Sequence, residues 1–213
     1  MSSGEKQYTV REERINAVTH LAGFALLFAG MFYLFSRSLA VSGISGFMAS
    51  LLYGMSLLFM FGISGLYHSL RSPRGRKIAR KLDHCAIYFL ITGSYAPLLC
   101  RVSPDRTGVI IFSLLSVLSL IGCAGNFFDI RSFKKFEIIL YIIMGWCCVS
   151  IAGKLIRTLP ATLLWLLASG GVSYTAGVIF YVKRREFSHA IWHLFVLAGA
   201  ALQFFAITGA MNL

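Results

Sequence analysis

Acidic residues are scarce in this chain of 213 residues. It holds 8 Asp and Glu against 20 Lys and Arg, and charged residues make up only 13% of the sequence. Hydrophobic residues make up 57%, and the mean hydropathy is +0.75. Soluble domains carry about 25% charged residues, so this composition excludes an ordinary soluble domain. It indicates a membrane protein that crosses the bilayer several times.

Paired cysteines and nucleic-acid motifs are also missing. The five cysteines form no CxxC pair and lie in or at the ends of apolar runs, which favours small buried residues over a disulfide framework. The net charge of +12 is typical of a membrane protein with basic cytoplasmic loops, and no sequence motif indicates nucleic acid as a partner. Residues 1–14 are polar and predict no cleavable signal peptide.

Seven apolar runs approach the length of about 20 residues that a helix needs to cross a bilayer. The loops between them are short, and no linker or low-complexity segment separates them. The fold class predicted from this pattern is all-α, a seven-transmembrane helix bundle in a single domain over 1–213. The expected spans are 16–36, 44–68, 83–100, 107–125, 137–154, 161–182 and 190–211.

Basic residues predict the orientation of these spans, because cytoplasmic loops carry an excess of Lys and Arg. With a cytoplasmic N-terminus and an outside C-terminus, fifteen basic residues fall inside and five fall outside. An even number of spans would break this alternation. The inside set is Lys6, Arg11, Arg14, Arg71, Arg74, Arg76, Lys77, Arg80, Lys81, Arg131, Lys134, Lys135, Lys183, Arg184 and Arg185, and the outside set is Arg37, Arg101, Arg106, Lys154 and Arg157.

On this topology all five histidines fall at the cytoplasmic ends of four different spans, although these spans are distant in sequence. Ionisable residues within membrane segments are candidate functional groups, and a shared depth is what a common site requires. The histidines are His20, His68, His84, His189 and His193.

Three of these histidines predict a zinc site. His189 and His193 are four residues apart, so they share one face of a helix, and His68 adds a third imidazole from the second span. Three protein ligands with an open fourth position are typical of catalytic zinc, which lowers the pKa of bound water to about 7. The alternative is an interfacial histidine pair that hydrogen-bonds water and lipid headgroups.

Asp83 and Ser64 are the predicted catalytic side chains beside this site. Asp83 follows His68 after one short loop and is expected to orient water and carry a proton as general base. Ser64 lies four residues before His68 on the same helical face, where its hydroxyl can hold water or a substrate carbonyl. The alternatives are an N-cap role for Asp83 and a packing role for Ser64.

Four further polar residues are expected to surround the ligands. Glu13, Asn16 and His20 are spaced three and four apart and share a face. They form either a solvated helix entry or a layer that holds and shields the metal ligands. His84 follows Asp83 and points about 100° away around its helix, so an interfacial position is expected for it.

At these positions the sequence resembles the bacterial hemolysin III family. The matching motifs are Glu13-x-x-Asn16-x-x-Thr19-His20, Ser64-x-x-x-His68, Leu82-Asp83-His84, Gly93-Ser94-Tyr95-Ala96-Pro97 and His189-Ala190-Ile191-Trp192-His193. The family is grouped with progestin and adipoQ receptors and alkaline ceramidases, a superfamily of seven-span membrane hydrolases. The resemblance implies zinc on His68, His189 and His193, with Ser64 and Asp83 beside the water. It also implies a multi-pass protein of the bacterial inner membrane.

These observations lead to three hypotheses of different classes. The first is a zinc-dependent hydrolase of a lipid amide or related acyl bond, whose acyl chain enters between helices from the bilayer. The second is a non-catalytic sensor or regulator of lipid state with a structural metal, which four protein ligands and no open position would favour. The third is a pore-forming, cytolysis-associated protein, which seven apolar spans disfavour because they leave no soluble state.

Overall fold

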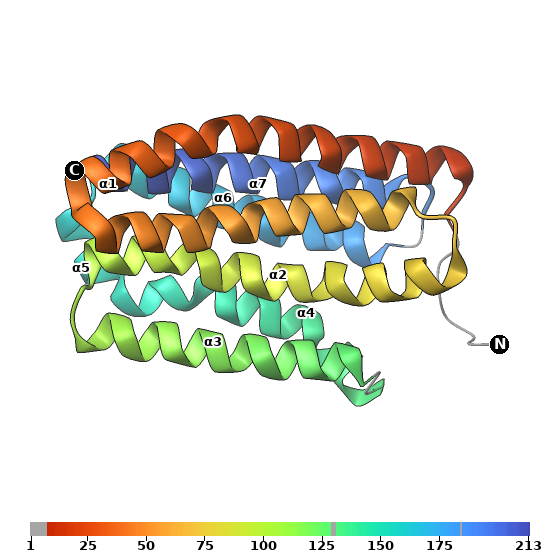
Figure 1. Ribbon diagram of the computed structural model, residues 1–213. Helices are drawn as coiled ribbons and strands as arrows, with labels where there is room; N and C mark the ends of the chain where they lie inside the picture. Colours follow the sequence, from red (N-terminus) through yellow and green to blue (C-terminus); the bar gives the residue numbers. More distant parts are fainter. Residues whose placement is uncertain (1–7, 129–130, 184) are drawn as a thin grey trace.

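The computed structural model describes residues 8–128, 131–183 and 185–213, and this part of the chain is entirely helical, as predicted (Figure 1). Every described element is a helix and none is a strand. In chain order the elements are α1 (Val10–Ser69), α2 (Pro73–Val102), α3 (Arg106–Phe127), α4 (Arg131–Gly145), the 3₁₀ helix η1 (Trp146–Ile151), α5 (Ala152–Thr158), α6 (Ala161–Val182) and α7 (Ser188–Ala210).

Helix α1 folds back on itself at Gly43, so its two halves run antiparallel (Figure 1). Gly43 has φ 63° and ψ −157°, a backbone conformation that is essentially restricted to glycine. The halves approach closely: Ser38 Oγ and Ser50 Oγ are 2.6 Å apart. A Cβ on Gly54 would lie 2.6 Å from Met31 Sδ. The hairpin therefore returns the end of α1 to the level of its beginning.

Six helices of the described part are long and apolar enough to cross a membrane, and α1 is counted once among them although it is 60 residues long. The two expected spans 16–36 and 44–68 are the two halves of this one element. Helix α6 coincides with the expected 161–182. Helix α2 begins earlier than the expected residue 83, at Pro73, because proline suits the first position of a helix.

The segment expected at 137–154 is a broken helix, made of α4, η1 and α5. The break lies where Tyr95 of α2 inserts its hydroxyl into the backbone. The Tyr95 hydroxyl donates to the carbonyl of Gly145 at 2.9 Å and accepts from the N–H of Cys148 at 2.8 Å. These backbone groups would otherwise pair within an α-helix, so the inserted side chain accounts for the local 3₁₀ geometry.

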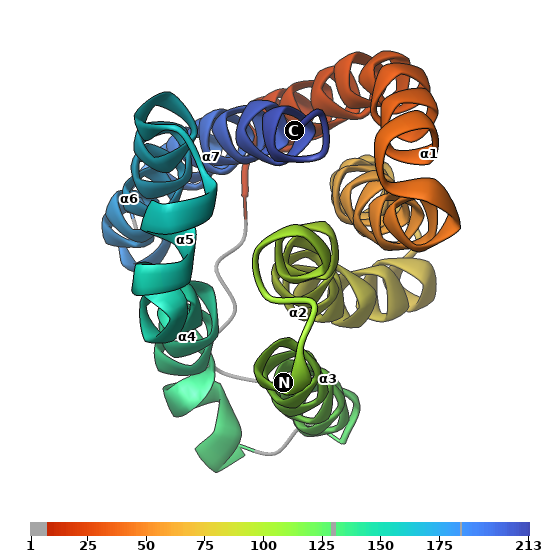
Figure 2. The same ribbon diagram turned by 90° about the vertical axis from the view of Figure 1, so that its left-hand side faces the viewer.

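Figure 2 looks along the axis of the bundle. In this view the two halves of α1 and then α2 to α7 are arranged in chain order around a ring. Large apolar side chains such as Leu26 and Phe32 point outward and are exposed, as lipid-facing residues are. The beginning of α1, the end of α1, the beginning of α2 and the beginning of α7 all lie at one end of the bundle (Figure 1). This end carries the predicted site residues.

Substituting Gly43 tests the hairpin. We expect Gly43→Ala to destabilise the protein by about 1–3 kcal/mol, because the side chain meets no atom within 4 Å and the whole cost is backbone strain. Gly145 is the matched control, because it also has open space around it but a helical φ of −62°. Gly145→Ala should be neutral or stabilising by up to about 1 kcal/mol. Unfolding in one detergent measures both, and equal stability of Gly43→Ala and wild type would contradict the hairpin geometry.

Candidate metal centre

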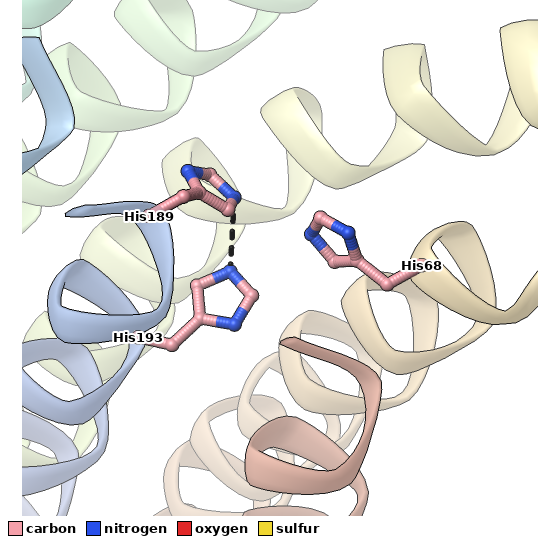
Figure 3. A group of neighbouring side chains, drawn as sticks. All are labelled: His68, His189 and His193. Carbon is pink, nitrogen blue, oxygen red and sulfur yellow. Dashed lines mark hydrogen bonds between the residues drawn. The ribbon is translucent and has the colours of Figure 1, made fainter. Parts of the chain in front are cut away.

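Three imidazoles from distant parts of the chain meet at one point. His68 comes from the end of α1, and His189 and His193 come from the first turns of α7 (Figure 3). One ring nitrogen from each lies within 4.8 Å of the others, and the Nε2 atoms of His189 and His193 are 3.1 Å apart. Tetrahedral zinc with Zn–N bonds of 2.0–2.1 Å holds its ligand nitrogens about 3.3 Å apart, so the cluster is close to that geometry.

Glu13 fixes the orientation and the tautomer of His68. The Nδ1 atom of His68 lies 2.6 Å from Glu13 Oε2, and the side chain of His68 is fully buried. Because a carboxylate only accepts hydrogen bonds, Nδ1 carries the proton. Nε2 then presents a lone pair to the cluster, and it has no hydrogen-bond partner among the described residues. A carboxylate behind a ligating histidine is the usual arrangement around a protein-bound metal.

The backbone of α1 fixes His193 in the same way. His193 Nδ1 lies 3.2 Å from the carbonyl oxygen of Asn16, which can only accept, so Nδ1 is the donor. Nε2 is left as an acceptor that faces His189, and the whole side chain is buried. Buried polar atoms are normally satisfied. The lone pair on His68 Nε2 has no partner among the described residues, and that on His193 Nε2 lies within hydrogen-bond distance of His189 Nε2, so a transition metal ion bound by the three nitrogens would satisfy both.

The predicted face of Glu13, Asn16 and His20 packs against this cluster. Glu13 contacts His68, the Asn16 carbonyl accepts from His193, and the His20 ring stacks on His193 with centroids 3.7 Å apart. The ring nitrogens of His20 and the side-chain amide of Asn16 are buried and lack hydrogen-bond partners within the described part of the chain. Their contribution to metal binding stays a prediction.

Asp83 and Ser64 line the same cavity as the three imidazoles. Ser64 Oγ and Asp83 Oδ1 are buried, and neither has a hydrogen-bond partner among the residues that the structure describes. The N-cap alternative for Asp83 is wrong, because the N-cap position of α2 is Ser72 and Asp83 lies well inside the helix. Both side chains are thus placed where water or substrate can contact them, and their catalytic roles stay predictions.

The three imidazoles line a polar cavity of about 1270 Å³. An apolar cavity of about 290 Å³ lies deeper between α2, α4, α6 and α7. The two adjoin, since the same five side chains line both: Met60, Ile87, Ile138, Tyr181 and Trp192. A ligand with a polar end and an apolar chain can therefore occupy both cavities at once.

His84 lines the polar cavity but is held by a separate cluster. Its Nδ1 lies 3.1 Å from Oε1 of Glu137, and the same oxygen accepts from Asn126 Nδ2 and from the Tyr141 hydroxyl, both at 2.7 Å. Glu137 was not predicted from the sequence. The sequence feature that could have identified Glu137 is its place at the start of an apolar run, where ionisable residues are rare.

Tyr8 is a second residue that the sequence analysis missed. Its ring centroid lies 5.0 Å from that of His189 and 6.0 Å from that of His68, and it lines the polar cavity. Burial raises the pKa of the Tyr8 phenol well above its ordinary value, so the hydroxyl is protonated at neutral pH. No sequence signal distinguished it, because Tyr8 precedes the first apolar run.

Comparisons with known proteins agree with one family over most of the chain. The sequence profile described as Haemolysin-III related matches residues 8–204, a range that includes every residue of the cluster. Hemolysin-3 of Bacillus cereus is 35% identical over 199 residues, which cover 93% of this chain and 91% of that protein. The Hemolysin-3 homolog of Bacillus subtilis (strain 168) is 32% identical and covers 94% of each chain. The human monocyte to macrophage differentiation factor is 30% identical over 73% of this chain and 67% of its own length.

Removing the negative charge of Glu13, which pairs with His68 Nδ1, tests the arrangement of the cluster. We expect Glu13→Gln to lower zinc affinity by about 10–100-fold, because a carboxylate that bonds a ligating histidine orients it and raises its basicity. Competition with a chelator of known affinity measures the change. Glu186→Gln is the matched control, since Glu186 is exposed and does not line the cavity. Equal zinc affinity of Glu13→Gln and the control would contradict the role of Glu13.

Proposed function

The chain belongs to the Haemolysin-III related family of membrane proteins, as its motifs predicted, and on this premise we propose that it is a zinc-dependent hydrolase of a lipid amide or related acyl bond. The observation that carries the proposal is the meeting of three imidazoles, an acid and a hydroxyl in one cavity that continues into an apolar one. A zinc-dependent hydrolase of a membrane lipid needs ligands for the metal, an acid–base group beside the water and a space for the acyl chain, and these residues and cavities can supply each of them.

His68, His189 and His193 would hold the ion, with Glu13 and the Asn16 carbonyl fixing two of the rings. Zinc, when bound, supplies a Lewis acid that activates water and polarises a carbonyl oxygen. Three protein ligands leave one position open for this chemistry. The tight packing around the rings keeps their nitrogens directed at one point, which is the preorganisation that catalysis requires.

Asp83 is the proposed general base and Ser64 the proposed hydrogen-bonding partner of the substrate carbonyl or of the attacking water. The Asp83 carboxylate accepts a proton from water as the water oxygen bonds to the acyl carbon. It then returns the proton to the leaving amine or alcohol when the acyl bond breaks. The products are a fatty acid and the deacylated lipid, and the acyl chain occupies the apolar cavity beside Trp192.

Single substitutions separate metal binding from catalysis. We expect His193→Ala to lose zinc, because it removes a ligand that is fixed by the α1 backbone. We expect Asp83→Asn to keep zinc and lose hydrolysis of fluorescent N-acyl and O-acyl lipids, by 10²-fold or more. Metal analysis of the purified proteins and fatty-acid release measure the two effects.

The matched control for Asp83→Asn is Asp105→Asn, which removes a carboxylate at the opposite end of the bundle. Asp105 pairs with Lys154 there, and this pairing holds the pKa of its carboxyl well below the usual value. This variant should keep both zinc and activity. Full zinc retention by a variant with alanine at His68, His189 and His193 would end the hydrolase proposal.

The proposed topology has seven crossings, a cytoplasmic N-terminus and an outside C-terminus in the bacterial inner membrane. It follows if the two halves of α1 cross separately, which the hairpin at Gly43 favours. The metal cluster then lies at the cytoplasmic face, together with most basic residues.

Reporter fusions after Leu213 test this topology. Alkaline phosphatase at this position should be active and green fluorescent protein dark, because only the phosphatase folds outside the cytoplasm. Fusions in the loop at residues 70–72 should give the reverse pattern. A fluorescent protein that is bright after Leu213 would contradict an odd number of crossings.

One observation favours the second candidate, a non-catalytic regulator with a structural metal. The His20 ring is buried against His193 and its nitrogens lack partners among the described residues. It is outside the group of three nitrogens that lie within 4.8 Å of one another, so it would close the site as a fourth ligand only after a rotation of its ring. His20→Ala distinguishes the two functions. Zinc bound through four imidazoles in the wild type and three in this variant, measured by X-ray absorption, would support the closed site, whereas three imidazoles in both proteins with retained activity would support the hydrolase.

A further inference from the structure

One face of α2 changes character along its length, from charged to apolar. Arg76 and Arg80 are four residues apart, and Asp83 and Ile87 continue the same face at helical spacing. All four line the polar cavity. Ile87 also lines the apolar cavity, which Leu90 extends one turn further. The wall beside the candidate metal centre therefore presents, in order, guanidinium groups, a carboxylate and hydrocarbon.

The polar cavity as a whole carries an excess of positive charge. Cationic side chains from α1, from the segment after it, from α2 and from the segment after α6 line it, and only two carboxylates do. Both oxygens of Glu13 are engaged by His68 and Arg76. Three of the cations, Arg14, Arg71 and Lys183, are exposed, so the excess lies towards the solvent side of the cavity, its mouth. The cations are Arg14, Arg71, Arg76, Arg80 and Lys183, and the carboxylates are Glu13 and Asp83.

The two α2 guanidinium groups are partly sheltered from solvent. Arg76 is half-buried, with its guanidinium carbon 4.7 Å from the centre of the Tyr67 ring, and it donates to Glu13. Arg80, one turn deeper, is also half-buried. A guanidinium held in this way has less freedom to lose when it binds an anion, and its planar donors match two phosphate oxygens. These are features of a phosphate site more than of a solvated basic loop.

We propose that the substrate of the proposed hydrolase is a phospholipid, whose phosphate group binds Arg71, Arg76 and Arg80. This inference rests on the proposed function and names its substrate class. By helix geometry, Arg80 is about 4.5 Å and Arg76 about 10 Å from Asp83 along the α2 axis. In a glycerophospholipid a few covalent bonds separate the phosphate from the nearest acyl carbonyl, so both groups fit this wall together.

The reaction on such a lipid is ester hydrolysis. The water oxygen bonds to the acyl carbon, the acyl carbon–oxygen bond breaks, and the leaving glycerol oxygen takes the proton that Asp83 carries. The fatty acid and the lysophospholipid are the products. The acyl chain lies in the apolar cavity, and the phosphate stays at the mouth throughout.

The chain offers a matched control for general attraction of anionic lipids to a basic surface. Arg74 and Lys77 lie on the first turns of the same α2, at the same end of the bundle, and are exposed. Neither lines the polar cavity. Arg74→Gln with Lys77→Gln therefore removes the same charge as Arg71→Gln with Arg80→Gln, but outside the proposed site.

The test measures lipid binding to the full-length, zinc-loaded protein in detergent. Labelled phosphatidic acid and diacylglycerol with identical acyl chains are the probes. We expect phosphatidic acid to bind more tightly than diacylglycerol. The Arg71→Gln, Arg80→Gln protein should bind phosphatidic acid about tenfold or more weakly, since each charged hydrogen bond lost costs at least that factor. Its diacylglycerol binding and the phosphatidic acid binding of the control protein should not change.

Other outcomes overturn the inference. Equal losses in the two double variants would show general attraction to the basic face, and equal binding of both lipids by the wild type would show a neutral substrate. Inorganic phosphate should compete with phosphatidic acid; binding of inorganic phosphate without such competition would indicate a separate free-phosphate site. Zinc is measured in every preparation, so loss of zinc reports failure of the proposed function, whereas lipid results with intact zinc report on the substrate class alone.

Discussion

The hydrogen bond between Glu13 and His68 is the interaction on which the candidate metal centre depends. It joins the two halves of α1 at a largely buried position, sets the His68 tautomer and directs its Nε2 into the cluster. The same carboxylate also accepts from Arg76 at the start of α2. One side chain thus connects the imidazole cluster to the basic mouth of the cavity. The two pairings offset the cost of holding a partly buried carboxylate away from solvent.

Two unusual backbone conformations, at Gly43 and at Phe187, bring these groups together. The glycine conformation at Gly43 reverses α1, so residues near its two ends become neighbours. At the entry to α7, Phe187 has a left-handed φ of 56°, and its N–H donates to Glu12 Oε1 at 3.0 Å. A bulky residue in this conformation is an outlier that the surroundings must hold in place. Here the conformation presents His189 and His193 to the end of α1.

Residue spacing predicted much of this arrangement because helical period and charge bias are local properties. The pairing of His189 with His193 follows from a spacing of four, and so does the shared face of Glu13, Asn16 and His20. Features that depend on contacts between distant helices were not predictable. Tyr95 breaks α4 from a different helix, and Glu137 is joined to His84 only by the packing of α4 on α2. The early start of α2 at Pro73 was missed because its first turns are polar.

X-ray absorption spectroscopy of the metal in the purified protein tests the central claim most directly, because it reports ligand type and number without a substrate. The account predicts zinc with three imidazole nitrogens at about 2.0–2.1 Å and one further oxygen ligand. Substituting His68 by alanine should weaken zinc binding, and any zinc that the variant still holds should show one imidazole fewer. A metal bound through cysteine sulfur, or a spectrum that this substitution leaves unchanged, would contradict the account.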